Sequence, residues 1–278
     1  MSRKQAAGTA DTGTAHTGTA HTDAAPARPI ANGAVRVLLA GLVGLVGVTT
    51  TAGALTADEI IERMEANQTH STAIMEGRMV ISDRFGDRAS TYIVHSEGAD
   101  RFLVEFTSRN EEGQRVLRRD DSLYLYYPDA RETIRVQGAA LRDNLLGSDI
   151  SYEDMTGGRG LREDYRFELL GEESVDGHGT YKVQLNARST NVAYPMQVLW
   201  IDRQDFVLRR SEQFARSGRL LKTTTILETT RQAGYHFPTR IRIVDETRRS
   251  SGTEMIIENA RLGVSLPAGI FSLEELSW

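Results

Sequence analysis

The sequence predicts a mainly β protein whose exported part forms a single, strongly curved antiparallel sheet of about 11–12 strands. Three observations lead to this fold class. From residue 73 onward, apolar and polar residues alternate with a period of two, which is typical of strands. Most connections between these segments are short runs of turn-forming residues, too short for a parallel crossover. No helical pattern alternates with the strands to supply such crossovers.

The first 54 residues are predicted to be a disordered leader followed by a secretory signal peptide. Residues 1–27 are rich in Ala, Thr and Gly and cannot form an apolar core. Basic residues then precede the apolar run Val37–Val48, and Ala52-Gly53-Ala54 supplies a cleavage site near Ala54. The run is too short for a membrane span, which needs about 20 residues. The long leader leaves two possibilities open, a misassigned start codon or an extended basic region.

The mature domain is predicted to span residues 55–278 and to begin with a short amphipathic helix over Ala57–Gln68. Thr56 followed by Glu59 has the spacing of a capping box, in which each side chain bonds to the other residue's backbone N–H. One face of this helix is apolar, so it must be buried against another part of the domain. The residues on that face are Ile60, Ile61 and Met64.

Strands are expected wherever the period-two pattern runs between turn-forming residues. In Leu123–Tyr127 both faces are apolar or aromatic, which indicates a strand covered on both sides. A sheet of this size must curl or close, because a flat open sheet leaves unpaired edges. The predicted strands are Ala73–Ser82, Ser90–His95, Arg101–Thr107, Gln114–Arg118, Ser122–Tyr127, Glu132–Val136, Tyr165–Leu170, Tyr181–Ala187, Met196–Asp202, Phe206–Phe214, Leu220–Glu228, Thr239–Glu246 and Met255–Leu262.

One long interruption, residues 137–164, divides the strands into two groups. Leu141, Leu145 and Leu146 share a helical face there, and Ser148 is expected to cap a second short helix. An insertion of this length between tightly connected strands is typical of a lid or a binding loop.

Composition and motifs exclude several functions. The chain has no cysteine, which excludes disulfides, thiolate metal sites, a cysteine nucleophile and a lipid-modified cysteine. Its net charge of −5 gives no reason to expect a nucleic-acid partner. No catalytic signature is present, and the histidines after residue 54 have no metal-ligand spacing. We therefore expect no enzyme activity, no cofactor and no metal site.

Several segments together carry a family resemblance. The most specific is the string from Gly147 to Asp154, GSDISYED. The weaker segments are Leu123–Pro128 with Ile134-Arg135, Tyr181–Val183, Pro195–Asp202 and Phe237–Arg240. In this order, and across most of residues 55–278, the chain resembles the LolA/LolB-like family, in particular its outer-membrane lipoprotein-sorting protein branch.

The resemblance implies an unclosed, half-open β-barrel whose concave apolar face is covered by short helices and takes up acyl chains. It also implies a periplasmic carrier that binds acyl chains of a lipoprotein or a lipid and passes them toward the outer membrane. The partners implied are an inner-membrane transporter and an outer-membrane acceptor, and we expect a monomer. The lid arginine and partner contacts of better-known members match no motif here and are not carried over.

Two sets of residues are predicted to form the binding site. Exposure of a C16 acyl chain to water costs a free energy of roughly 12 kcal/mol. A carrier therefore needs a concave surface that excludes water and a cover that moves aside when the acyl chain binds. The predicted lid residues are Ile60, Ile61, Met64, Leu141, Leu145 and Leu146. The predicted cavity residues, some of which are expected to be ordinary core, are Leu123, Leu125, Tyr127, Leu199 and Phe206.

Three alternatives stay open at the level of sequence. The first is a periplasmic lipid- or lipoprotein-sensing accessory protein of the same fold, without a transport role. The others are an enzyme acting on lipids and a structural β protein with a solid core. A carrier requires an apolar hollow under the helices, so an interior filled by the protein's own side chains would exclude it.

Overall fold

The computed structural model describes residues 55–156, 160–190, 192–248 and 251–277. The predicted leader, signal peptide and cleavage site lie outside the described residues. The residues from Leu55 onward belong to one compact unit. None of the helices in the described ranges is long and apolar enough to cross a membrane.

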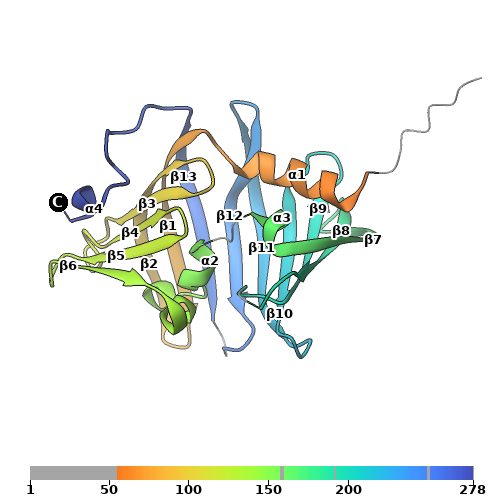
Figure 1. Ribbon diagram of the computed structural model, residues 1–278, viewed down its shortest axis with the longest axis horizontal. Coiled ribbons are helices and arrows are strands. Elements are labelled where there is room, and N and C mark those ends of the chain that lie inside the picture. The colour runs from red at the N-terminus through yellow and green to blue at the C-terminus, as the bar shows by residue number, and fades with distance from the viewer. Residues whose placement is uncertain (1–54, 157–159, 191, 249–250, 278) are drawn as a thin grey trace, which may run out of the picture. The chain divides into compact units, whose positions relative to one another are not determined.

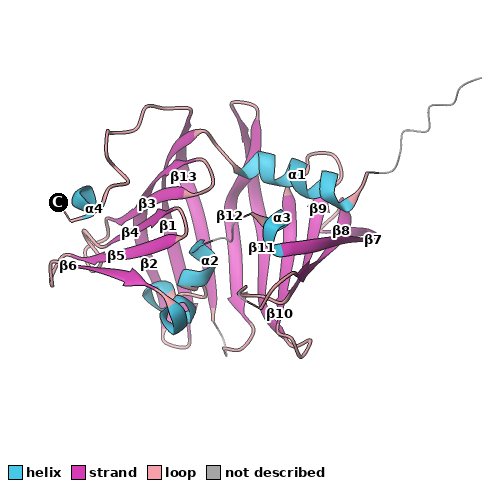
Figure 2. Cartoon of the chain, in the orientation of Figure 1, coloured by secondary structure: helices cyan, strands magenta, loops and turns pink. Residues whose placement is uncertain are grey.

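Thirteen antiparallel strands form one sheet, which is not closed into a barrel (Figures 1 and 2). The predicted mainly β class and unclosed sheet are therefore confirmed, and each of the thirteen strands overlaps one of the predicted segments, although their total was put at about 11–12. The strands are β1 (Thr72–Asp83), β2 (Gly86–Glu97), β3 (Arg101–Phe106), β4 (Arg115–Arg119), β5 (Ser122–Tyr127), β6 (Glu132–Val136), β7 (Tyr165–Val175), β8 (His178–Ala187), β9 (Met196–Asp202), β10 (Leu208–Phe214), β11 (Leu220–Gln232), β12 (Tyr235–Asp245) and β13 (Gly252–Leu262).

The strand order explains the long interruption. Strands β1 to β6 step outward from the middle of the sheet to one edge, and β7 to β13 step back from the other edge to the middle. There β1 pairs with β13, while β6 and β7 are the two edge strands. The segment between β6 and β7 must therefore run from one edge of the sheet to the other, across one of its faces.

Short helices lie on that face, which we call the inner face (Figure 1). Helix α1 begins at the predicted capping box: Thr56 Oγ1 accepts from Glu59 N at 3.2 Å, and the Glu59 carboxylate accepts from Thr56 N at 2.8 Å. The helices of the inner face are α1 (Ala57–Gln68), the 3₁₀ turns η1 (Gly138–Arg142) and η2 (Leu145–Gly147), α2 (Tyr152–Thr156) and α3 (Leu161–Asp164); the remaining described helix, α4 (Leu273–Leu276), lies on the other face.

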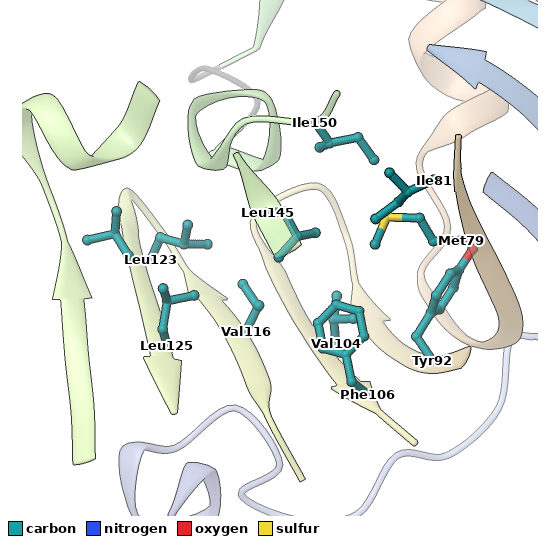
Figure 3. Packing of buried hydrophobic residues seen from close by; sticks show 11 residues of the cluster. Met79, Ile81, Tyr92, Val104, Phe106, Val116, Leu123, Leu125, Leu145 and Ile150 are labelled. Carbon is teal, nitrogen blue, oxygen red and sulfur yellow. The ribbon is translucent and has the colours of Figure 1, made fainter. Parts of the chain in front are cut away.

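Two apolar clusters fill the two ends of the inner face. The first cluster joins β1–β6 to the segment between β6 and β7, which we call the crossing segment (residues 137–164). It consists of Met79, Ile81, Tyr92, Val104, Phe106, Val116, Leu123, Leu125, Val136, Leu145 and Ile150 (Figure 3). The second cluster joins α1 to β7–β9 and consists of Ile60, Ile61, Met64, Tyr165, Val183, Leu185, Leu199 and Ile201. The central strands, β11 to β13, contribute no fully buried residue to either cluster.

The outer face of β3 and β4 is covered by the chain after β13. Leu276 of α4 packs on Leu103 and Leu117, and all three are buried. Arg115 Nη1 donates to the carbonyl oxygens of Glu275 and Leu276, each at 3.2 Å. This end of the sheet is therefore covered on both faces, in agreement with the two-sided apolar pattern of Leu123–Tyr127.

Gly77 holds the seam between β1 and β13. The register of this pair shifts between Glu76 and Gly77, which is a β-bulge. A Cβ atom at Gly77 would lie 2.2 Å from the backbone oxygen of Ile256 and 3.1 Å from the hydroxyl of Tyr92. Because a carbonyl of the neighbouring strand cannot move aside cheaply, only glycine fits at this position.

Candidate functional site

A hollow remains over the central strands, between the two apolar clusters. Its larger part, which we call the apolar chamber, has a volume of about 760 Å³ and lies beside α1 and the start of α3. Such a volume is within the range of small-molecule sites, roughly 300–1,000 Å³. The side chains that make it apolar are Met64, Met75, Leu161, Leu208, Ile226, Phe237, Ile241 and Ile257.

A smaller and more polar chamber adjoins the first. The polar chamber has a volume of about 310 Å³ and shares Gly160, Leu161 and Thr224 with the apolar chamber. Its wall includes an ion pair between Asp154 of α2 and Lys222 of β11. The two chambers together form an amphipathic hollow, with one apolar end and one end lined by charged and amide side chains.

Helices α1 and α3 are tied to each other beside the apolar chamber. Leu161 N donates to the Glu65 carboxylate at 3.1 Å, and Arg162 pairs with Glu62 at 2.9 Å. The far end of α1 is held by Asn67, whose amide donates to the carbonyl oxygen of Asp205 at 2.7 Å. The contacts on the outer side of this cover are thus a few partly exposed polar ones.

The crossing segment is pinned to the sheet by a fully buried carboxylate. Asp149 accepts hydrogen bonds from the hydroxyls of Ser251 at 2.6 Å and Thr253 at 3.0 Å. Its own backbone N–H donates to the Thr253 hydroxyl at 2.8 Å. Arg248 donates to the carbonyl oxygen of Ser148 at 2.7 Å. These bonds fasten the middle of the segment to the β12–β13 hairpin.

This network corrects the expected helix cap. Ser148 does not cap α2; it is buried, and its hydroxyl accepts from Ile150 N at 3.1 Å. The cap is Ser151, whose hydroxyl accepts from Asp154 N at 3.2 Å while the Asp154 carboxylate accepts from Ser151 N at 2.7 Å. The spacing S-x-x-D starting at Ser151 carried this signal and was missed, because Ser148 follows a glycine that ends the preceding turn.

Burial governs the charge states around the hollow. Burial raises the pKa of Glu153, while the nearby Arg142 partly offsets that rise. Burial also raises the pKa of Tyr194, whose hydroxyl donates to Asp154 Oδ1 at 2.6 Å. In the apolar chamber, burial lowers the pKa of His70, so that its neutral form is favoured. The hollow therefore disfavours any charge that has no counter-ion within it.

The five predicted cavity residues lie in the packed clusters. Leu123 and Leu125 are buried in the first cluster, and Tyr127 packs against it. Leu199 is buried in the second cluster, and Phe206 packs against that one. The two chambers are lined by other residues. Leu123, Leu125, Tyr127 and Leu199 are thus inward-facing positions toward the two ends of the sheet, and Phe206 lies in the connection between β9 and β10.

The predicted lid residues also fall into two groups. Ile60, Ile61 and Met64 face the second cluster from α1, and Met64 borders the apolar chamber as well. Leu145 is buried in the first cluster, with Leu141 and Leu146 packed against it. Of the six predicted lid residues, Met64 alone lines the hollow.

Sequence reasoning missed the residues that line the apolar chamber. Ile226, Ile241 and Ile257 face inward from three neighbouring strands, as the register of β11, β12 and β13 requires. The signal for them was weak, because these strands alternate as the others do and nothing in their local sequence indicates that the space above them stays unfilled.

The described residues offer no metal centre, since no three His, Asp or Glu side chains among them lie close enough to hold an ion. The arrangement is suited to non-covalent binding. It combines a preformed apolar volume, a polar end and a helical cover attached by a few bonds.

Comparisons with known proteins agree with this architecture. A family model described as an uncharacterized protein family matches residues 98–278. A DUF1329 family protein from Desulfovibrio piger has a TM-score of 0.73 and 23% identity, covering 78% of this chain and 96% of that one. No curated protein matches the chain.

Two further solved structures have the same fold. A domain from Vibrio parahaemolyticus, named for outer membrane lipoprotein sorting, has a TM-score of 0.72 and 21% identity, covering 80% of this chain and 100% of that one. A LolA superfamily protein from Nitrosomonas europaea has a TM-score of 0.67 and 24% identity, with the same coverage. At these identities the likeness concerns the fold, and it confirms the predicted LolA-like architecture.

Proposed function

Since the chain belongs to a family described as uncharacterized proteins, whose model matches residues 98–278, and has a LolA-like fold, we propose that it is a lipid carrier of the periplasm. It binds acyl chains of a lipoprotein or of a lipid in the apolar chamber and passes them toward the outer membrane. The observation that carries the proposal is that chamber: about 760 Å³ of mostly apolar space left beside α1 by the protein's own side chains.

The energetics of acyl transfer support a site of this kind. A C16 chain exposed to water costs roughly 12 kcal/mol, at about 0.8 kcal/mol per methylene. Ile226, Ile241 and Ile257 form an apolar floor for the acyl chain, and Met64 and Leu161 contact it from the opposite side. A site that recovers most of this free energy can keep a lipid soluble during passage between two membranes.

The helical cover, formed by α1 and α3, is held together partly by weak polar contacts. Arg162 and Glu62 link α3 to α1 through side chains that are 46% and 67% exposed, and such exposed pairs contribute less than about 1 kcal/mol. Opening α1 also breaks the apolar contacts of Ile60, Ile61 and Met64 in the second cluster, so in this proposal the entering acyl chain replaces those contacts. In this proposal α1 acts as the lid.

The names of the structural neighbours support the same function, since two of them are named for lipoprotein sorting or for the LolA superfamily. The proposal includes export by a signal peptide cleaved near Ala54, action as a monomer, and delivery from an inner-membrane transporter to an outer-membrane acceptor. It assigns no chemical reaction to the hollow.

The test is lipid capture by a variant whose chamber is filled. The full chain is purified from the periplasm of its own cells without detergent, and its bound lipid is measured by native mass spectrometry. Ile257→Trp places a large side chain on the chamber floor, and we expect at least tenfold less bound lipid. The matched control is Leu227→Trp on β11, where the original side chain is 43% exposed.

Thermal melting separates loss of binding from loss of fold. We expect both tryptophan variants to melt within a few degrees of the original protein, with capture lost in Ile257→Trp alone. Absence of any acyl lipid in the original protein, or equal capture by the two variants, contradicts the proposal.

A further inference from the structure

The charges that line the hollow are almost all of one sign. Glu153, Asp154 and Asp164 line the polar chamber, and Lys222, the one basic residue that lines it among the described residues, is paired with Asp154. Glu65 and Asp100 border the apolar chamber, and no lysine or arginine in the described part of the chain does. The full chain has 33 lysines and arginines, so this distribution is a property of the site and not of the composition.

Two neutral side chains in the same hollow have polar atoms without hydrogen-bond partners among the described residues. His70 is 6% exposed, borders the apolar chamber, and its Nε2 has no partner. Gln213 borders the polar chamber, and its buried Oε1 has no partner. Buried polar atoms are normally satisfied, so both positions are suited to polar groups of a ligand.

The rings around His70 limit what can reach it. The ring of His70 lies 4.6 Å from that of Tyr235 and 5.3 Å from that of Phe237, measured between centroids. In these apolar surroundings the neutral imidazole can exchange one hydrogen bond with an ester, amide or hydroxyl group. Gln213, an uncharged amide, is limited to the same kind of bond.

We propose that the hollow is selective for a lipid whose polar end is uncharged, of the diacylglyceryl type, and that it rejects lipids bearing a phosphate. This inference rests on the proposed function and names the ligand class of that site. A phosphate drawn into the polar chamber would lose its hydration beside Glu153 and Asp164, with the single ammonium already engaged by Asp154. A glyceryl or amide group loses less hydration and can bond to Gln213 and His70.

Basic residues do lie on the other side of the Asp154–Lys222 pair. Arg142 and Arg216 line a separate hollow there, which shares Glu153 and Lys222 with the polar chamber. Of the hollows that the described residues form on this face, the outer hollow is the one with arginines to hold the headgroup of a phosphate lipid. Binding of a phosphate headgroup in the outer hollow is therefore the alternative outcome, and substitution of Arg142 and Arg216 tests for it.

The experiment compares lipids that differ only in the phosphate. The delipidated full chain is loaded with a fluorescent diacylglycerol, which is then displaced by dioleoylglycerol or by dioleoylphosphatidic acid. We expect dioleoylglycerol to bind at least tenfold more tightly, which corresponds to about 1.4 kcal/mol. A third competitor, an N-acetylated dipalmitoylglyceryl-cysteine peptide, carries the same uncharged polar end. Its affinity relative to dioleoylglycerol tells whether a lipoprotein or a free glyceride is the better source.

Charge variants connect the selectivity to the polar chamber. Glu153→Gln should raise the affinity for dioleoylphosphatidic acid at least threefold, and Asp164→Asn provides an independent second variant. Glu163→Gln makes the same charge change at an exposed position on α3 outside both chambers and should leave the ratio unchanged.

Two results overturn the inference in different ways. Equal or tighter binding of dioleoylphosphatidic acid, reduced by Arg142→Gln with Arg216→Gln, overturns the headgroup selectivity and assigns the phosphate to the outer hollow. That result leaves the carrier proposal intact. Failure of every competitor and of the fluorescent lipid to bind overturns the carrier proposal together with the inference.

Discussion

Lys222 and Asp154 form an ion pair on the inner face, between the middle of the sheet and the segment that crosses it. Both side chains are largely buried, with 8% and 21% of their surface exposed. Tyr194 donates its hydroxyl to the other oxygen of the same carboxylate at 2.6 Å. The three residues thus join β11, α2 and the β8–β9 connection in the wall of the polar chamber.

Removing the cation of this pair should be costly. Lys222→Met leaves the Asp154 carboxylate buried without its counter-ion, and we expect the free energy of unfolding to fall by about 3–5 kcal/mol. Urea denaturation measures the change. Lys182→Met is the matched control, because Lys182 pairs with the 48%-exposed Glu173 and should contribute no more than about 1 kcal/mol. Similar losses in the two variants would show that burial of the pair has no energetic weight.

The crossing segment depends on Asp149. Asp149→Ala removes the acceptor for Ser251 and Thr253 from a fully buried position, so we expect a loss of about 3 kcal/mol in urea denaturation. We also expect faster proteolysis within residues 138–156. Asp87→Ala, at an exposed position in β2, should stay within about 0.5 kcal/mol of the original protein. If residues 138–156 resist proteolysis in Asp149→Ala as they do in the original protein, the packing of their leucines is enough to hold the segment and the expected role of Asp149 is wrong.

The seam between β1 and β13 tolerates no side chain at Gly77. Gly77→Ala forces a methyl group against the Ile256 carbonyl, and we expect a loss of about 3 kcal/mol in thermal or urea unfolding. Gly179→Ala on β8 is the control, because a Cβ there would lie an ordinary 3.7 Å from Arg203. Equal stability of the two alanine variants would contradict the close approach at the bulge.

Stability should decrease as the pH falls below the ordinary pKa of histidine. Burial lowers the pKa of His70, His95 and His236 in the folded protein from the usual 6.5. Between the lowered values and 6.5 the unfolded chain binds more protons than the folded one, so acid favours unfolding. Urea denaturation at pH 7.5, 6.5 and 5.5 should give progressively lower stability. His70→Phe should weaken this dependence, and a dependence identical to that of the original protein would exclude His70 as a contributor.

The strands could be predicted because each carries a local signal. Period-two alternation identified all thirteen segments, and short turns identified their antiparallel pairing. The errors were at strand ends and had local causes. Strand β12 begins at Tyr235 and not at the predicted Thr239. It includes Pro238, which lies beside an irregularity in the β11–β12 register, where a missing N–H is tolerated.

The site could not be predicted to the same degree, because inward-facing apolar residues look alike in sequence. Leu123 and Ile241 both point to the inner face, yet Leu123 packs under the crossing segment and Ile241 borders the hollow. The difference depends on where the cover lies over the sheet. That position is set by long-range polar contacts, such as Asp149 with Thr253, which no local pattern reveals.

The central seam also has a kinetic consequence. Within each half of the sheet, every strand pairs with its neighbour in sequence, so both halves can assemble from local contacts. Ala73 and Leu262, paired across the seam, are far apart along the chain, and joining them carries the largest loop-closure entropy. We therefore expect docking of the two halves to be the late step of folding. A weakened seam, as in Gly77→Ala, should accelerate unfolding while leaving the refolding rate nearly unchanged.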